Sequence, residues 1–363
     1  MLNLLFDIFD TIQQFFVRLI KLYHLQTLKE KGIIWSIGLL ISTALVVWLV
    51  LAFIWSQEPD LFDVNKQTEA MIMQINSSEG SHFTRAVGAT TTATVIQVAS
   101  TLLDKPGGYL SNDVTPPGVF LDNMPNWEYG VLVQVRDVVR VLRNDFSMAQ
   151  STSTEDKALS MAEPAFNNDS EKWLWPSSES KYREGIKYLH NYLMRLLDVK
   201  KQNAQFFARA DNLADWLQVV EKRLGSLSQR LSASVGQERI NTNLAGDAQA
   251  QQSTHEPEKL MVKTPWTEID DIFYEARGTS WALVHLLKAI EYDFRSVLKK
   301  KNALVSLRQI IRELEATQQT VFSPIILNGS GFGMTANHSL VMASYISRAN
   351  AAIIDLKRLL QDG

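Results

Sequence analysis

Hydrophobic positions along most of the chain recur every three or four residues, the period of an α-helix with one apolar face. The clearest stripe follows an unbroken four-three spacing through Phe206, Ala210, Leu213, Leu217, Val220, Leu224, Leu227 and Leu231. Further stripes run through residues 131–146, 182–196, 269–297, 304–314 and 342–360. Because each stripe must be covered by other helices, the pattern predicts a mainly α-helical fold, an elongated helical bundle.

Residues 33–55 depart from this pattern because they are apolar around the whole helix. The stretch of 23 residues contains no charged side chain and lies between Lys31 and Glu58. At ~1.5 Å per residue it would span about 35 Å, enough to cross a hydrocarbon core of about 30 Å. It predicts a single transmembrane helix that contacts the lipid bilayer. The alternative, a buried core helix, is disfavoured because core helices of this length keep a polar face.

The charges that flank this helix predict its orientation. Four cations precede it, namely Arg18, Lys21, Lys29 and Lys31, whereas Lys66 is the one cation within the fifteen residues after it. Cytoplasmic flanks are enriched in Lys and Arg, so residues 1–32 are expected in the cytoplasm and residues 61–363 on the other side of the membrane. No small-x-small cleavage site follows the apolar run, which predicts an uncleaved signal anchor.

Residues 2–20 form a second apolar segment, with twelve apolar positions interrupted by Asp7, Asp10 and Gln13. The pattern is typical of a helix that lies in the cytoplasmic interface of the membrane with its aromatic side in the headgroup region. A surface for a partner helix would show the same pattern, and the two interpretations stay open.

Three stretches lack a helical period and are predicted as irregular loops: residues 106–125, 149–178 and 236–264. The first contains four prolines and apolar side chains, so we expect it to be packed. The second is polar, and the third is rich in Gln, Asn, Thr and Ala. Residues 83–103 are rich in small side chains and are predicted as a helix that a neighbour can approach closely.

Composition excludes several classes of function. With 46% hydrophobic and 21% charged residues, the chain has the composition of a folded protein. Its 36 Lys and Arg against 39 Asp and Glu give a net charge of −3, so no overall basic field favours nucleic acid as a partner. The absence of cysteine removes disulfides, thiol nucleophiles and Cys-ligated zinc.

A glycine-rich stretch at residues 328–333 precedes the last apolar stripe. Backbone amides near Gly329, Gly331 and Gly333 could converge with a helix N-terminus on a phosphate or carboxylate. No strand-loop-helix pattern surrounds the stretch, and the lysine of a phosphate-binding loop is missing. The competing interpretation is a tight connection in which Thr335 or Asn337 caps the final helix.

Other candidate chemistry is weaker. Glu268, Asp271 and Glu275 share one predicted helical face, with His285 further along, but the Glu-x-x-His pairs of bundle metal sites are absent. Two Ser-x-x-Lys matches are expected by chance, and neither His-Glu-x-x-His nor Gly-x-Ser-x-Gly occurs. The sequence therefore predicts no catalytic residue, no metal and no cofactor.

Several stretches together resemble an uncharacterised bacterial family, domain of unknown function 2333. They are GGYLSND at 107–113, NWE at 126–128, RLGSLSQRL at 223–231, KTPW at 263–266, RELEAT at 312–317, NGSGFG at 328–333 and ANHS at 336–339. The resemblance implies an inner-membrane protein of proteobacteria, with its C-terminal domain in the periplasm. The family has no assigned activity, so the resemblance brings no catalytic residues.

Three hypotheses of function follow. The first is a non-enzymatic scaffold that binds an envelope protein partner. The second is an enzyme acting on an envelope polymer or lipid, with a site where residues 106–125 meet residues 328–338; its polar groups would be Asn112, Asp113, Asn337 and His338. The third is a ligand sensor, which would need a separate transducer because 32 cytoplasmic residues leave no room for an output domain.

Overall fold

The computed structural model describes residues 13, 14, 17, 21–80, 82–149, 154–198, 200, 201, 203–240, 259–323, 325–330 and 333–362. The chain divides into two compact units, Met1–Ile54 and Trp55–Gly363. In both units the dominant element is the α-helix, as the periodicity of the sequence predicted.

The first unit is built on a long apolar helix. Its elements are α2 (Leu25–Lys31) and α3 (Ile33–Trp55), the last residue of which belongs to the second unit. No residue of α3 is buried, and in the described part of the chain α3 is the one helix long and apolar enough to cross a membrane. The hydroxyl of Ser36 donates to the carbonyl of Gly32, so this polar side chain needs no water. The predicted helix at residues 2–20 lies outside the described residues, apart from 13, 14 and 17.

The second unit is a helical domain around one hydrophobic core. Its α-helices are α4 (Val64–Glu79), α5 (Ala89–Asp104), α6 (Asn123–Val141), α7 (Lys157–Phe166), α8 (Ser178–Leu197), α9 (Ala210–Ser232), α10 (Ile269–Asp293), α11 (Arg295–Lys300), α12 (Leu304–Ala316) and α13 (His338–Asp362). Shorter elements are the 3-10 helices η1 (Gly118–Phe120), η3 (Ala233–Val235) and η4 (Trp266–Glu268), the π-helical turn η2 (Leu142–Phe146) and the strands β1 (Gln237–Ile240) and β2 (Lys259–Val262). The predicted mainly helical fold is confirmed.

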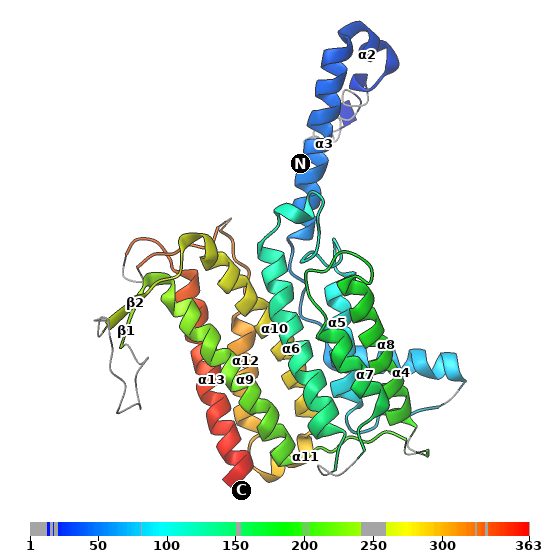
Figure 1. Cartoon of the computed structure of the whole chain (residues 1–363), viewed down its shortest axis with the longest axis vertical. Helices are drawn as coiled ribbons and strands as arrows, with labels where there is room; N and C mark the ends of the chain where they lie inside the picture. Colours follow the sequence, from blue (N-terminus) through cyan, green and yellow to red (C-terminus); the bar gives the residue numbers. More distant parts are fainter. Residues whose placement is uncertain are drawn as a thin grey trace, which may run out of the picture. The chain divides into compact units, whose positions relative to one another are not determined.

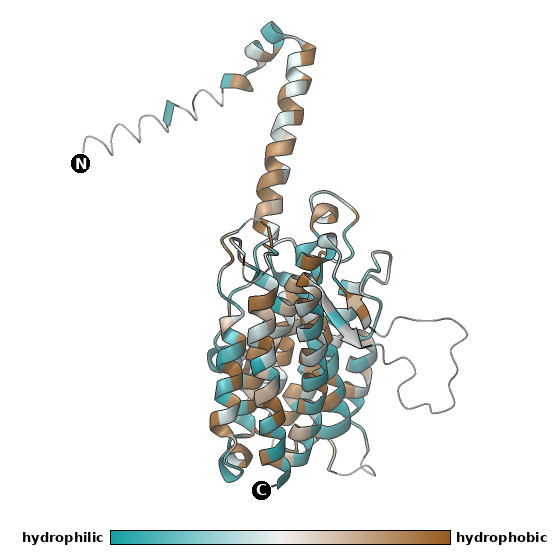
Figure 2. Ribbon diagram, turned by 90° about the vertical axis from the view of Figure 1, so that its left-hand side faces the viewer, coloured by the Kyte–Doolittle hydropathy of each residue, from teal (hydrophilic) through white to brown (hydrophobic). Residues whose placement is uncertain are grey.

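The long helices lie side by side, so the connections between them fall at two ends of the bundle (Figure 1; hydropathy in Figure 2). The connections α5–α6, α7–α8, α9–α10 and α12–α13 share one end. Trp55 lies at the same end, because a Cβ added at Gly107, in the α5–α6 connection, would come within 2.7 Å of Trp55 Cγ. We call this the entry end, since the chain enters the domain there.

Two glycines allow α6 and α10 to pack at short range. A side chain on Gly278 would overlap with the carbonyl oxygen of Trp127, and one on Gly130 would overlap with that of Glu275. Backbone contact of this kind is possible only where neither helix presents a Cβ. Helix α10 is consequently enclosed on all sides over much of its length, with an unbroken run of buried residues from Ala276 to Leu287.

An extended segment, residues 56–63, covers one face of α10. Glu58 pairs with Arg277, the carbonyl of Asp60 accepts from Trp281 Nε1 (3.3 Å), and the amide of Phe62 donates to His285 Nε2 (3.0 Å). The three partners on α10 are four residues apart, so they share one face. Every second residue from Glu58 to Phe62 is therefore bonded to α10.

Residues 149–178 were predicted to be irregular. This prediction was wrong for Lys157–Phe166, which form α7. The side chain of Asp156 caps this helix by accepting from the amides of Ala158 and Leu159. With ten residues and an internal Pro164, α7 has a weak local signal. Packing of its apolar side on α8, with Phe166 against Gly185, stabilises it.

Three other boundaries also differ from the prediction. Helix α5 begins at Ala89 rather than near residue 83, because Gly88 has a left-handed backbone (φ 85°) and Phe206 packs over it. Within residues 106–125 the chain forms η1, and α6 begins at Asn123, capped by Asp122. Within residues 236–264, β1 and β2 pair antiparallel, so the domain is not purely helical; residues 241–258 lie outside the described residues.

Candidate functional site

The predicted site residues of the α5–α6 connection contact the α7–α8 region. Asn112 is buried, and its Nδ2 donates to the carbonyl of Lys172 (3.0 Å) and to Glu179 Oε2 (2.9 Å). Asp113 is partly buried, which raises the pKa of its carboxyl, and the nearby Glu179 raises this pKa further. Asn112 therefore holds the connection against α8.

The predicted site residues before α13 form a separate cluster. Asn337 Oδ1 accepts from the amide of Leu340 (2.8 Å), which makes Asn337 the N-cap that the sequence placed at Thr335 or Asn337. Its Nδ2 donates to Asn328 Oδ1 and to the carbonyl of Gly329. His338 Nδ1 accepts from the amide of Leu327. Gly331 lies outside the described residues, whereas Gly333 lies in the bend before α13.

The two clusters make separate sets of hydrogen bonds. In the described part of the chain no hydrogen bond joins residues 106–125 to residues 328–338. Asn328 instead donates to the carbonyl of Ser234, in η3. The enzyme hypothesis for Asn112, Asp113, Asn337 and His338 stays a prediction.

The acidic residues at the start of α10 have partners of their own. Glu275 pairs with Arg230, and Asp271 Oδ1 accepts from Asn126 Nδ2 at 2.7 Å. Partial burial, together with the neighbouring carboxylates, raises the pKa of Asp271 to about 6. His285 lies on α10 beyond these carboxylates, against the extended segment.

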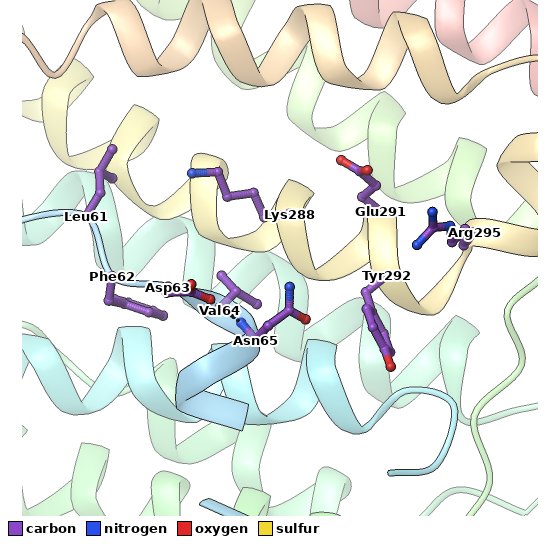
Figure 3. A pocket seen from close by; sticks show the side chains of 9 residues that line it. All are labelled: Leu61, Phe62, Asp63, Val64, Asn65, Lys288, Glu291, Tyr292 and Arg295. Atoms are coloured by element: carbon purple, nitrogen blue, oxygen red, sulfur yellow. Dashed lines mark hydrogen bonds between the residues drawn. The ribbon is translucent and has the colours of Figure 1, made fainter. Parts of the chain in front are cut away.

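A cavity of about 460 Å³ lies between the extended segment and α10 (Figure 3). It is lined by Leu61, Phe62, Asp63, Val64, Asn65, Lys288, Glu291, Tyr292 and Arg295. Lys288 pairs with Glu315 and Glu291 pairs with Arg308, each across to α12. Two cations and two carboxylates line this cavity, so its charge does not indicate a class of ligand.

His285 packs against Phe62, one of the residues that line this cavity. It is wholly buried, stacks on Phe62 at 3.8 Å and lies 2.7 Å from the carbonyl of Trp281 through Nδ1. Since Nδ1 faces an acceptor and Nε2 accepts from Phe62, the ring is neutral with its proton on Nδ1. Burial lowers the pKa of His285 to about 3.

We expect this histidine to steepen the loss of stability in acid. Its pKa is about 6.5 in the unfolded chain, so its contribution is complete above that pH and declines as the pH falls toward 3. Below pH 6 the free energy of unfolding should fall by up to about 1.4 kcal/mol per pH unit more in the wild type than in His285→Gln. Denaturant titrations of both proteins in detergent between pH 7.5 and 4.5 measure this difference; parallel curves would contradict it.

A second cavity, of about 510 Å³, is a groove between α6 and α9 with α10 at its base. In Figure 1 α10 lies between these two helices. The groove is lined by Tyr129, Val133, Gln134 and Arg140 of α6, by Val219, Lys222, Arg223, Ser226, Leu227 and Arg230 of α9, and by Glu275 and Thr279 of α10. We call it the α6–α9 groove.

Its cations outnumber its carboxylates. Arg223 binds Asp137 through two hydrogen bonds of 2.8 and 3.1 Å, and Arg140 shares the same carboxylate at 2.5 Å. Arg230 binds Glu275 in the same two-pronged way, at 2.5 and 2.7 Å. Four cations against these two carboxylates leave two positive charges in the groove.

Two groups that line the groove lack a partner among the described residues. Lys222 is exposed and has no ion-pair partner among the described residues. Gln134 is almost fully buried, yet its Nε2 has no hydrogen-bond acceptor within the described chain. A buried donor without an acceptor costs about 1–3 kcal/mol. A ligand that supplies an oxygen would remove this cost if the Gln134 side chain turned toward the groove that it lines.

The sequence analysis did not predict the cations of this groove. A spacing of seven residues places Arg223 and Arg230 on one side of α9, and this spacing is visible in the sequence. Gln134 and Asp137 gave no such signal, because the docking of α6 beside α9 decides what they face.

Comparison with known proteins gives a family and no activity. The model of a family described as "Uncharacterized protein conserved in bacteria (DUF2333)" matches residues 28–363. No curated protein matches the chain, and no solved structure does.

Proposed function

The chain belongs to the DUF2333 family of bacteria, which has no assigned activity, and we propose that it is a membrane-tethered, non-enzymatic module that binds an acidic segment of a protein partner in its α6–α9 groove. The tether is α3, and the cations that precede it favour a cytoplasmic N-terminus. The helical domain would then lie in the periplasm, at the surface of the inner membrane.

The surplus of positive charge beside the unpaired Gln134 nitrogen is the observation that carries the proposal. Carboxylates satisfy both features, because they neutralise cations and accept hydrogen bonds. The apolar side chains of Val133, Val219 and Leu227 lie among these charges, so the ligand also carries apolar groups. An acidic peptide with interspersed apolar residues has this chemistry.

The length of the groove also suits a peptide. From Tyr129 to Arg140 the α6 wall covers eleven residue steps, or about 16 Å. That length accommodates about five residues of an extended chain at ~3.3 Å each. Glu275, the carboxylate in the lining, is held by two bonds from Arg230 and is not free to act as a general base, which supports binding rather than catalysis.

A defined peptide tests the proposal. The probe is a fluorescent ten-residue peptide of alternating Glu and Leu, titrated with the full chain in nanodiscs and followed by anisotropy. We expect saturable binding that weakens with salt, and Lys222→Glu should weaken it on the order of tenfold because an attraction becomes a repulsion. Gln134→Leu should also weaken it, since the buried donor is removed.

One control moves the charge reversal to another part of the domain, and the other removes the charge of the peptide. Lys300→Glu makes the same charge reversal at the far end of the bundle, on α11, and should leave binding unchanged. A peptide of alternating Gln and Leu should bind less tightly than the Glu peptide. Equal binding of both peptides, or equal losses in the Lys222 and Lys300 variants, would refute the assignment of the groove.

A further inference from the structure

Large apolar side chains are exposed on four connections of the helical domain. The most exposed are Phe120 (75% exposed), Trp175 (89%), Trp266 (77%), Phe322 (95%) and Met334, with Trp173 beside Trp175. We call these six residues the apolar rim. Exposed Trp and Phe in such number are unusual for a protein surface that contacts only water.

The apolar rim is confined to one end of the bundle. Its residues lie in the connections α5–α6, α7–α8, α9–α10 and α12–α13, which share the entry end (Figure 1). The other end exposes Val87 (56%), in the α4–α5 connection, and Val305 (78%), at the start of α12, but within the described residues of the domain no Trp or Phe is exposed there. The exposed Trp and Phe side chains of the domain are thus concentrated at the entry end.

The position of Trp55 identifies what covers the rim. Trp55 is the last residue of α3 and lies against Gly107, in one of the rim-bearing connections. The segment that follows it is held on α10 by Glu58 and Arg277, so the chain enters the domain at this end. If α3 crosses a bilayer, the entry end is therefore joined to the bilayer surface by the shortest length of chain.

We infer that the apolar rim inserts into the headgroup region of the bilayer and holds the domain against the membrane. Trp and Phe prefer this region because it accommodates an apolar ring beside water. In residues 105–122, 167–177, 263–268 and 317–337 carboxylates outnumber cations, so the contact is apolar and does not need anionic lipid. The inference rests on the proposed tether but not on the α6–α9 groove.

The cysteine-free chain permits a direct test by site-directed spin labelling. Single cysteines replace Phe120, Trp175 and Phe322 on the rim, Lys300 at the far end and Leu45 within α3. The full chain is reconstituted in phosphatidylcholine nanodiscs, and accessibility to oxygen and to a water-soluble nickel chelate is compared for each label. We expect the three rim labels to show severalfold less exposure to the chelate than the Lys300 label, approaching the Leu45 label.

Each result separates the rim from the tether. If the Leu45 label is in lipid and the rim labels match Lys300 in water, the rim inference is overturned while the tether stands. If the Leu45 label is itself exposed to water, both are overturned. Rim labels that are protected only after a protein partner is added would likewise overturn it, since a protein rather than lipid would then cover the rim.

Discussion

Replacing Glu128 with alanine should lower the free energy of unfolding by about 3–5 kcal/mol, because it leaves a buried ammonium group without its partner. Lys105 and Glu128 are both fully buried, and Lys105 Nζ lies 2.5 Å from Glu128 Oε1. The same carboxylate accepts from the amides of Leu110 (2.8 Å) and Ser111 (2.9 Å). One side chain on α6 therefore holds the start of the α5–α6 connection through several bonds.

The charge of Glu128 depends on these partners. Burial raises the pKa of this carboxyl, and the adjacent Lys105 opposes the rise. In a variant that lacks Glu128, the buried ammonium group of Lys105 has no counter-charge, so its desolvation lowers the free energy of unfolding. Replacing both, as Lys105→Met with Glu128→Leu, should recover most of the lost stability, since an apolar pair of similar volume needs no compensation.

Denaturant titration of the full chain in detergent, followed by tryptophan fluorescence, measures both effects. Arg209→Ala is the matched control, because its ion pair with Asp211 is exposed and is expected to contribute less than about 1 kcal/mol. A loss below about 1 kcal/mol for Glu128→Ala would mean that water reaches the pair in solution.

Arg277→Ala should be similarly costly, by about 3–5 kcal/mol, and its effect should appear first in the extended segment. The guanidinium binds Glu58 in a two-pronged way, at 2.7 and 2.8 Å from Nε. Its Nη1 also donates to the carbonyls of Thr317 (2.9 Å) and Gln319 (2.8 Å). This buried side chain thus joins the extended segment, α10 and the α12–α13 connection at one point.

Arg277→Lys provides a discriminating comparison. Lysine keeps the positive charge, but its single ammonium group cannot bond both oxygens of Glu58 and also reach the carbonyls of Thr317 and Gln319. We therefore expect a loss of stability between that of the wild type and that of Arg277→Ala. Hydrogen exchange of residues 56–63 should accelerate in Arg277→Ala and less in Arg277→Lys. Unchanged exchange in that segment, despite a lower stability, would show that Arg277 does not hold the extended segment.

The sequence by itself determined the helical elements with strong local periodicity. The stripes at residues 206–231, 304–314 and 342–360 correspond to α9, α12 and α13, and the uncharged run corresponds to α3. These predictions succeeded because a helix brings residues three and four apart onto one face, which a linear pattern reveals. The stripe at 269–297 was also helical, although Phe294 divides it into α10 and α11.

Only the tertiary structure decided which faces meet. Helix α7 forms because it packs on α8, and α6 approaches α10 closely because Gly130 and Gly278 come opposite backbone carbonyls. The α6–α9 groove and the ion pair between Glu58 and Arg277, 219 positions apart, depend on how whole helices dock. Periodicity carries no information about that docking, since the same apolar stripe packs equally well on several neighbours.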